Sequence, residues 1–214
     1  MIQSLFSVDI YETKFEDVDL LKKLSDPEYV KTYTVGKYDE VIRTSGNTVS
    51  GNQSWHTVTD SEKIYLRPEF APLKEFIENH AKIYWDHLGY YSGIYPKIYQ
   101  SWVTVYGPGG YGAVHHHGRS PMSGVVYLSS IPDQGNIEFT NPMDLILSSG
   151  VYLGDRTKIY KEIVATTGKI ILFPGYLPHR IRVNETDSNR ISLAFNLNED
   201  GIYIDKNSAL QGNS

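Results

Sequence analysis

Apolar side chains recur at helical spacing in two stretches of the first half of the chain. Over 68–88 they follow three- and four-residue steps, which is the spacing of one face of a helix. Pro68 in the first turn and Gly89 after the last apolar position are typical of a helix start and a helix stop. Residues 16–33 predict an earlier helix, which the Asp26-Pro27 step interrupts or restarts.

From residue 98 onward the pattern changes to short runs with strand-like alternation, bounded by Gly, Pro, Asn or Asp. The predicted strands are 98–106, 112–117, 122–130, 136–140, 150–154, 158–165, 169–174, 179–184 and 189–197. Helices followed by eight or nine short strands predict a mainly β fold, a jelly-roll or barrel packed against two or three N-terminal helices. Because βαβ repeats are lacking, a parallel doubly wound sheet is not expected.

Length and composition fit one domain. The chain has 214 residues, of which 40% are hydrophobic, enough for one sizeable core. We expect a single domain over 1–214, with helical support and loops over 1–97, a β core over 98–204 and a frayed tail over 205–214. Residues 34–64, rich in Gly, Ser, Thr and Asn, predict loop, short strands and a flap near the site, and 141–149 an insertion loop.

Charge and cysteine content exclude several classes of protein. A net charge of -5 disfavours broad nucleic-acid binding. The lack of cysteine excludes disulfides, zinc fingers, iron–sulfur clusters and a cysteine nucleophile. No apolar run reaches the roughly 20 residues that span a bilayer, and the start does not resemble a signal peptide, so we expect a cytoplasmic protein without membrane contact. Serine hydrolase and phosphate-loop motifs are also missing.

Three consecutive histidines stand in the strand half of the chain. If His115, His116 and His117 lie on a strand, alternation puts the first and third on one face, where they could bind one metal. His179 follows the apolar run 170–173 and could complete a three-nitrogen face. A solvated loop is the alternative for the first group, and a hydrogen-bonded structural histidine for the second.

A second set of candidates suits a carboxylate. Alternation puts Arg190 and Ser192 on one face, and a guanidinium with a hydroxyl suits a carboxylate. Tyr106 and Tyr127 could reach the same pocket, although strand packing is the commoner role of such tyrosines. For the arginine, a surface position at a strand start is the alternative. The glycines of 107–112 predict a turn rather than a nucleotide loop, because no helix follows them.

In these motifs the chain resembles the iron(II)- and 2-oxoglutarate-dependent oxygenases, in particular their prolyl-hydroxylase-like branch and its small phage and bacterial relatives. The likeness spans roughly 98–197 in matching order and spacing. Its parts are 105–111 leading into His115-x-His117, 123–128, 135–139, 172–179 and 190–195.

The resemblance implies a double-stranded β-helix, a cupin-like jelly-roll. It implies iron(II) bound by His115, His117 and His179, and a cosubstrate site in which Arg190 with Ser192 binds the distal carboxylate of 2-oxoglutarate near Tyr106 and Tyr127. No catalytic residue beyond the metal site is implied. The implied reaction is hydroxylation with dioxygen, and with ascorbate as reductant, of a small molecule or of a prolyl or other peptide side chain. The oligomeric state is left open.

One position departs from the commonest family pattern. His117 stands where most members carry Asp or Glu, although some small relatives carry His-x-His. Three neutral imidazoles leave the site one negative charge short, which weakens iron(II) retention and favours zinc or copper. Two alternatives therefore stay open: a zinc enzyme with a three-histidine site, which needs no arginine clamp, and a non-catalytic jelly-roll binding module. For an oxygenase we expect Val103, Val125 and Phe195 to keep water from the site.

Overall fold

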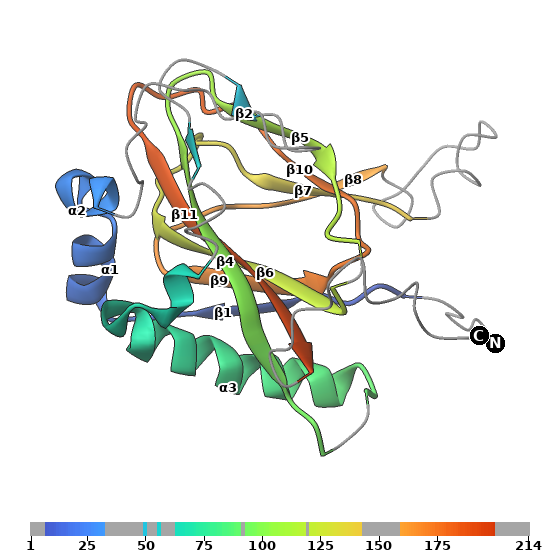
Figure 1. The fold of residues 1–214 in the computed structure, drawn as a ribbon. Helices are drawn as coiled ribbons and strands as arrows, with labels where there is room; N and C mark the ends of the chain where they lie inside the picture. The colour runs from blue at the N-terminus through green and yellow to red at the C-terminus, as the bar shows by residue number, and fades with distance from the viewer. Residues whose placement is uncertain are drawn as a thin grey trace, which may run out of the picture.

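Two antiparallel sheets form the body of the protein, with helices on the outer side of the larger one (Figure 1). The computed structural model describes residues 7–32, 49–50, 55–56, 63–90, 93–118, 120–142 and 159–199. This arrangement confirms the mainly β fold packed against helices. No helix in these ranges is long and apolar enough to cross a membrane.

The helices form where the sequence predicts them. They are α1 (Val18–Leu24), α2 (Pro27–Lys31) and α3 (Ala71–His87), with the single 3-10 turns η2 (Ile64–Leu66) and η3 (Pro68–Phe70) ahead of α3. Asp26 accepts hydrogen bonds from the first backbone N–H groups of α2 and so restarts the helix after α1. Gly89 takes a φ of +72° just after α3, a conformation that glycine adopts without strain.

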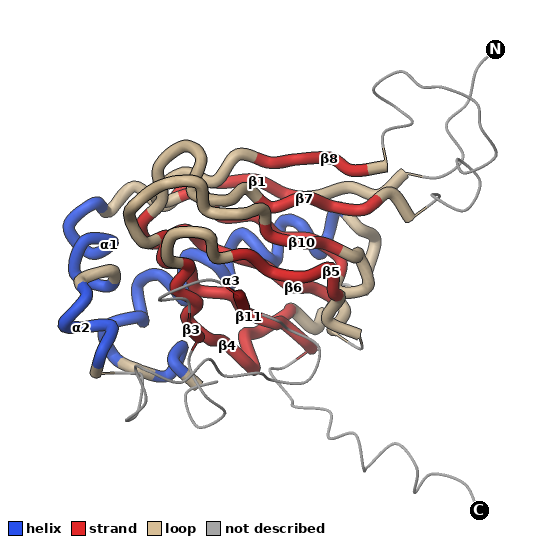
Figure 2. The backbone as a smooth tube through the Cα atoms, turned by 90° about the horizontal axis from the view of Figure 1, so that it is seen from above, coloured by secondary structure: helices blue, strands red, loops and turns tan. Residues whose placement is uncertain are grey.

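The larger sheet has the order β1-β9-β6-β11-β4-β3. Its strands are β1 (Tyr11–Lys14), β9 (Lys169–Pro174), β6 (Met122–Ser129), β11 (Arg190–Glu199), β4 (Pro96–Tyr106) and β3 (Trp55–His56). The smaller sheet has the order β2-β5-β10-β7-β8. Its strands are β2 (Val49–Ser50), β5 (Tyr111–His115), β10 (His179–Ile181), β7 (Ile137–Thr140) and β8 (Tyr160–Ile163). Figure 2 shows β5, β10, β7 and β8 side by side.

Two differences from the expected strands have physical reasons. β5 ends at His115 rather than at 117, because the chain turns at Gly118, whose φ is +58°. β1 is absent from the predicted strands, because it is an edge strand in which only every second residue is partly covered. The predicted strand 150–154 and tail 205–214 lie outside the described residues, as do most of 34–64 and 141–149. The division into support and core stays a prediction.

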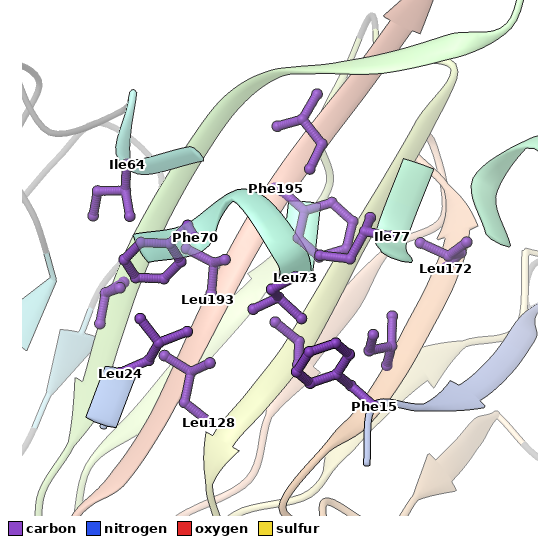
Figure 3. Packing of buried hydrophobic residues seen from close by; sticks show 14 of the residues in the cluster. Phe15, Leu24, Ile64, Phe70, Leu73, Ile77, Leu128, Leu172, Leu193 and Phe195 are labelled. Atoms are coloured by element: carbon purple, nitrogen blue, oxygen red, sulfur yellow. The ribbon is translucent and has the colours of Figure 1, made fainter. Parts of the chain in front are cut away.

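Alternation gives the larger sheet two faces. One face packs on the helices, where Leu193 and Phe195 of β11 lie among Leu73 and Ile77 of α3 (Figure 3). The other face, with Val125, Tyr127, Ile171 and Phe173, packs against Ile137 and Phe139 of the smaller sheet. We call this second side the interior face.

The prediction that Val103, Val125 and Phe195 keep water from the site is wrong for two of these three residues. Val103 and Phe195 lie in the helix-side cluster, one residue out of phase with the interior face, and so do not line the pocket described below. Val125 does line it.

Candidate active site

The structure brings the three predicted histidines together between the sheets. His115 ends β5 and pairs directly with His179 at the start of β10. His117 follows two residues later, and its backbone N–H donates to the Gly175 carbonyl at 2.8 Å. One ring nitrogen from each histidine lies within 4.8 Å of the others. The cluster thus joins two adjacent strands and the loop that follows one of them.

Hydrogen bonds fix the orientation of two of these rings. The Nδ1 of His115 lies 2.8 Å from the Ala113 carbonyl, and the Nδ1 of His179 lies 2.9 Å from the Leu177 carbonyl. Because a carbonyl oxygen only accepts, each Nδ1 carries the proton and each Nε2 keeps its lone pair. Metal-binding histidines commonly have this arrangement.

His116 takes no part in the cluster. Its side chain is exposed, and its Nδ1 accepts a hydrogen bond of 3.0 Å from the backbone N–H of Gly118. The middle histidine of the run is therefore held away from the other three.

Burial keeps the three rings uncharged. It lowers the pKa of His179 to about 3, with a further contribution from His115, and it lowers the pKa of His115 itself. Burial also holds the pKa of His117 well below its ordinary value. Aromatic rings pack on two of the histidines: the ring centroids of Phe173 and His179 lie 4.7 Å apart, and those of Trp102 and His117 lie 5.6 Å apart. At neutral pH a proton therefore does not compete with a metal for these nitrogens.

Arg190 is buried on the same side of the larger sheet. It is 1% exposed, and one terminal nitrogen donates to the Gly135 carbonyl. The rings of Tyr106 and Tyr127 lie 4.6 Å and 5.4 Å from the guanidinium carbon. No carboxylate pairs with this arginine among the described residues, and its Nε has no hydrogen-bond partner there. A buried guanidinium stays charged and costs free energy without an anion, so this end of the pocket favours one.

The Tyr127 hydroxyl is a second buried donor without a partner in the part of the chain that is described. Burial raises the pKa of Tyr127 to about 12, so the phenol keeps its proton. Burial also raises the pKa of Tyr106, whose hydroxyl oxygen lies 2.8 Å from where a Cβ on Gly112 would stand. Glycine at that position therefore leaves room for the tyrosine.

One pocket connects the histidines to Arg190. Its lining also includes Trp102, Thr104, Tyr106, Gly112, Ala113, Gly124, Val125, Ile137, Phe173, Ile181, Ser192 and Ala194. Along β11 and β4 the register pairs Arg190 with Tyr106, Ser192 with Thr104, and Ala194 with Trp102, which lies beside His117. The pocket thus runs from a cationic end to the histidine cluster, and Arg190 and Ser192 share a face as alternation predicts.

The three histidines, Arg190, Ser192 and Tyr106 line this pocket, whereas Tyr127 does not, and several supporting groups were not predicted. The Gly135 carbonyl is one; the sequence shows only a glycine there, and its φ of +90° is known from the structure alone. Trp102 and Phe173, which pack on the histidines, are others. The sequence does not mark these two as site residues, because aromatic residues are common in strands of any kind.

The side chains present fit both a divalent metal and a dicarboxylate. Three neutral imidazole nitrogens suit iron, zinc, copper or nickel. Among the described residues, the Nε of Arg190 and the hydroxyl of Tyr127 lack partners and are donors for a carboxylate. Ser192, 3% exposed, adds a hydroxyl to the pocket wall, which Tyr127 itself does not line. A metal ligand that carries a second, distal anionic group would satisfy both ends of the pocket.

Comparison with known proteins agrees with this chemistry. Residues 100–196 match the family model described as "Putative 2OG-Fe(II) oxygenase". No curated protein sequence matches the chain.

Solved structures share the fold at low sequence identity. A prolyl-4-hydroxylase from Pseudomonas putida has a TM-score of 0.57 at 15% identity, over 90% of this chain and 94% of that one. The carbocyclase SnoK from nogalamycin biosynthesis, a non-heme α-ketoglutarate-dependent enzyme, has a TM-score of 0.59 at 13% identity, over 89% of this chain and 80% of that one. HygX from Streptomyces hygroscopicus, solved with nickel, 2-oxoglutarate and hygromycin B, has a TM-score of 0.55 at 10% identity, over 90% and 83%.

Proposed function

Since residues 100–196 match the family model of putative 2OG-Fe(II) oxygenases, we propose that the chain is an iron(II)- and 2-oxoglutarate-dependent dioxygenase that hydroxylates its substrate. One observation carries the proposal: a single pocket has three uncharged histidines at one end and, at the other, a buried arginine that pairs with no carboxylate of the described residues. A purely structural role would not explain why the histidine cluster and the buried arginine line the same pocket.

His115, His117 and His179 would hold iron(II), each through one ring nitrogen. When bound, iron(II) with dioxygen and 2-oxoglutarate supplies oxidative decarboxylation to succinate and carbon dioxide, together with insertion of one oxygen atom into a substrate C–H bond. Ascorbate would serve as the reductant that keeps the iron in its iron(II) state. The chain's own contribution is to present neutral ligands, which the Ala113 and Leu177 carbonyls keep in the correct tautomer.

The cationic end would bind the distal carboxylate of 2-oxoglutarate. Arg190 and Tyr127 offer buried donors that have no partner in the described part of the chain, and Ser192 and Tyr106 line the wall. Because the site is buried, the attraction between guanidinium and carboxylate is screened little by water or salt. These contacts would orient the cosubstrate so that its other end reaches the histidines. Apolar Val125 beside them limits the entry of water.

The substrate class proposed is a prolyl or other peptide side chain. Its support is the shared fold with the Pseudomonas putida prolyl-4-hydroxylase, whose length this chain nearly matches. Hydroxylation of a small molecule is the second possibility, since HygX was solved with hygromycin B bound.

Succinate release tests the proposed activity. Purified protein is incubated with iron(II), ascorbate, oxygen and 2-oxoglutarate, with and without a panel of proline-containing peptides. We expect succinate formation that depends on 2-oxoglutarate and is lost in the His179→Ala variant, whereas the His116→Ala variant, changed at the exposed neighbour, keeps it. Background succinate together with no detectable binding of 2-oxoglutarate would contradict the proposal.

A zinc enzyme is the second candidate, favoured because the described residues give the cluster three histidines and no carboxylate. Metal analysis after purification without added metal distinguishes the two. One equivalent of zinc with no response to 2-oxoglutarate would favour hydrolysis or hydration at the zinc. A rise in melting temperature with 2-oxoglutarate but no turnover would instead indicate a binding module.

A further inference from the structure

A row of uncharged polar side chains crosses the interior face beside the histidines. The register aligns Gln100 of β4, Asn196 of β11, Ser123 of β6 and Phe173 of β9. Phe173 packs on the ring of His179 at 4.7 Å between centroids. The row therefore lies at the level of the histidine cluster.

This row lies on the far side of the cluster from the cationic end. Interior positions follow one another along β11 as Arg190, Ser192, Ala194 and Asn196. The partner of Ala194 is Trp102, which lies beside His117. A molecule that reaches the histidines from the side away from Arg190 would therefore meet the Asn196 row.

Gln100 faces this side by regular alternation with Trp102, and an irregularity in the sheet ends that alternation directly beyond it. Leu197 pairs with Ile98 and the preceding Asn196 pairs with Gln100, so β4 carries one extra residue, Tyr99. Ile98 lies in the helix-side cluster, whereas Gln100 bonds to Asn196 of the interior face. Without the bulge these two side chains, two residues apart, would share a face. The bulge thus turns Ile98 to the helix side and leaves Gln100 as the last interior position of β4.

The hydrogen bonds along the row have a direction. The Ser123 hydroxyl donates to Oδ1 of Asn196 at 2.8 Å, and Nδ2 of Asn196 donates to Oε1 of Gln100 at 2.8 Å. Ser123 and Asn196 are buried, while Gln100, at the β4 end of the row, is half-buried. No hydrogen bond joins the Gln100 Nε2 to any residue that the structure describes. The end of the row therefore presents two N–H donors.

We propose that Gln100, held by Asn196 and Ser123, is a substrate-binding residue that donates from its carboxamide nitrogen to a carbonyl oxygen of an uncharged, amide-containing substrate. The inference rests on the proposed function, because it takes the histidines as the reaction centre. The row carries no charge, so it does not select an ion. A carbonyl oxygen, such as that of a peptide group, is an acceptor that suits a neutral N–H donor.

Side-chain amide resonances test the proposal without turnover. N-acetyl-L-proline N′-methylamide is titrated into ¹⁵N-labelled protein loaded with zinc and 2-oxoglutarate. We expect a saturable shift of the Gln100 side-chain NH₂ signal, assigned by its loss in the Gln100→Leu variant. The NH₂ of Gln134, which donates to Ser188 at 2.7 Å in a distant turn, is the internal control and should not move.

Two variants examine the direction of the row. In the Gln100→Leu variant, binding of the probe is measured from the side-chain NH₂ signal of Asn196. The affinity should fall about fivefold, as expected for the loss of one hydrogen bond. Asn196→Asp, read at the Gln100 amide, should weaken it equally, because a carboxylate can only accept and would draw the Gln100 NH₂ inward. Lys161→Leu, on the exposed strand β8, should change nothing.

Binding of 2-oxoglutarate is measured in the same samples. If 2-oxoglutarate binds but the Gln100 signal does not shift up to the solubility limit of the probe, the substrate-binding inference is wrong and the proposed function stands. The inference is equally wrong if both variants bind the probe as the wild type does. If 2-oxoglutarate itself does not bind, the proposed function fails and the inference fails with it.

Discussion

Replacing Arg190 by methionine should weaken the binding of 2-oxoglutarate without lowering the stability of the ligand-free protein. Truncating a buried arginine that has an ion-pair partner usually costs about 3–5 kcal/mol, because the partner's charge stays buried alone. Arg190 is 1% exposed and pairs with no carboxylate among the described residues. Arg190→Met therefore removes a buried charge whose desolvation costs several kcal/mol. It leaves only the Gly135 carbonyl without its donor, a loss of about 1–3 kcal/mol. We expect the free protein to be as stable as the wild type or more stable.

Binding of 2-oxoglutarate should respond in the opposite direction. A charge-assisted hydrogen bond contributes about 1.5–3 kcal/mol, and the guanidinium offers two donors in a fork. The loss should reach about 3 kcal/mol or more, which raises Kd at least about a hundredfold. Calorimetric titration of zinc-loaded protein measures Kd, and urea unfolding of the metal-free protein measures stability.

A second ligand and a second variant are the controls. 2-Oxovalerate is the same 2-oxo acid without the distal carboxylate, so Arg190→Met should not change its affinity. The effect of Arg190→Met on 2-oxoglutarate binding minus its effect on 2-oxovalerate binding gives the coupling free energy between the guanidinium and the distal carboxylate. Arg182→Met removes a partly exposed arginine that pairs with Glu138 and should leave the affinity for 2-oxoglutarate unchanged. Unchanged binding of 2-oxoglutarate by Arg190→Met, or a loss of several kcal/mol of stability in the ligand-free variant, would refute the reasoning.

Three further predictions follow from the same pocket and its walls. Tyr127→Phe removes a buried hydroxyl that has no partner among the described residues; calorimetry should show about tenfold weaker binding of 2-oxoglutarate, and urea unfolding no loss of stability. For the metal-free protein, the unfolded state binds a proton at His179 below about pH 6.5, while burial lowers the native pKa to about 3. His179 alone should therefore lower the free energy of unfolding by up to about 1.4 kcal/mol per pH unit on acidification within that window, and His179→Gln should make the slope shallower by that amount. Gly124→Ala would place a Cβ 2.5 Å from the Phe195 ring and 2.8 Å from the Ile171 carbonyl; thermal unfolding should show a loss of about 1–3 kcal/mol from overpacking, and an unchanged melting temperature would contradict that geometry.

The fold could be predicted where burial imposes a period on the sequence. Strands β4, β6, β9 and β11 lie in the centre of the larger sheet, and their apolar alternation or continuous apolar runs made them recognisable. The edge strand β1 could not be predicted, because only its pairing with β9 makes it a strand. The bulge at Tyr99 also depends on the partner strand, since the register of β11 alone shows that β4 has an extra residue.

The site could be predicted as far as residue type and spacing determine it. Two histidines at a spacing of two, a third after an apolar strand and an arginine at a strand start were enough to propose a metal and a carboxylate. Their environment could not be predicted, because it depends on residues far along the chain. The Gly135 carbonyl bonds Arg190 across 55 positions. Likewise, the tautomer of His179 is known only once its Nδ1 is placed beside the Leu177 carbonyl.

A crystal structure of the protein grown anaerobically with iron(II) and 2-oxoglutarate tests the central claim most directly, with anomalous scattering to locate the metal. We predict iron about 2.0–2.2 Å from one ring nitrogen each of His115, His117 and His179, with the distal carboxylate of 2-oxoglutarate bonded to Arg190 and Tyr127. Iron bound elsewhere, or a cosubstrate whose distal carboxylate points away from Arg190, would contradict the account.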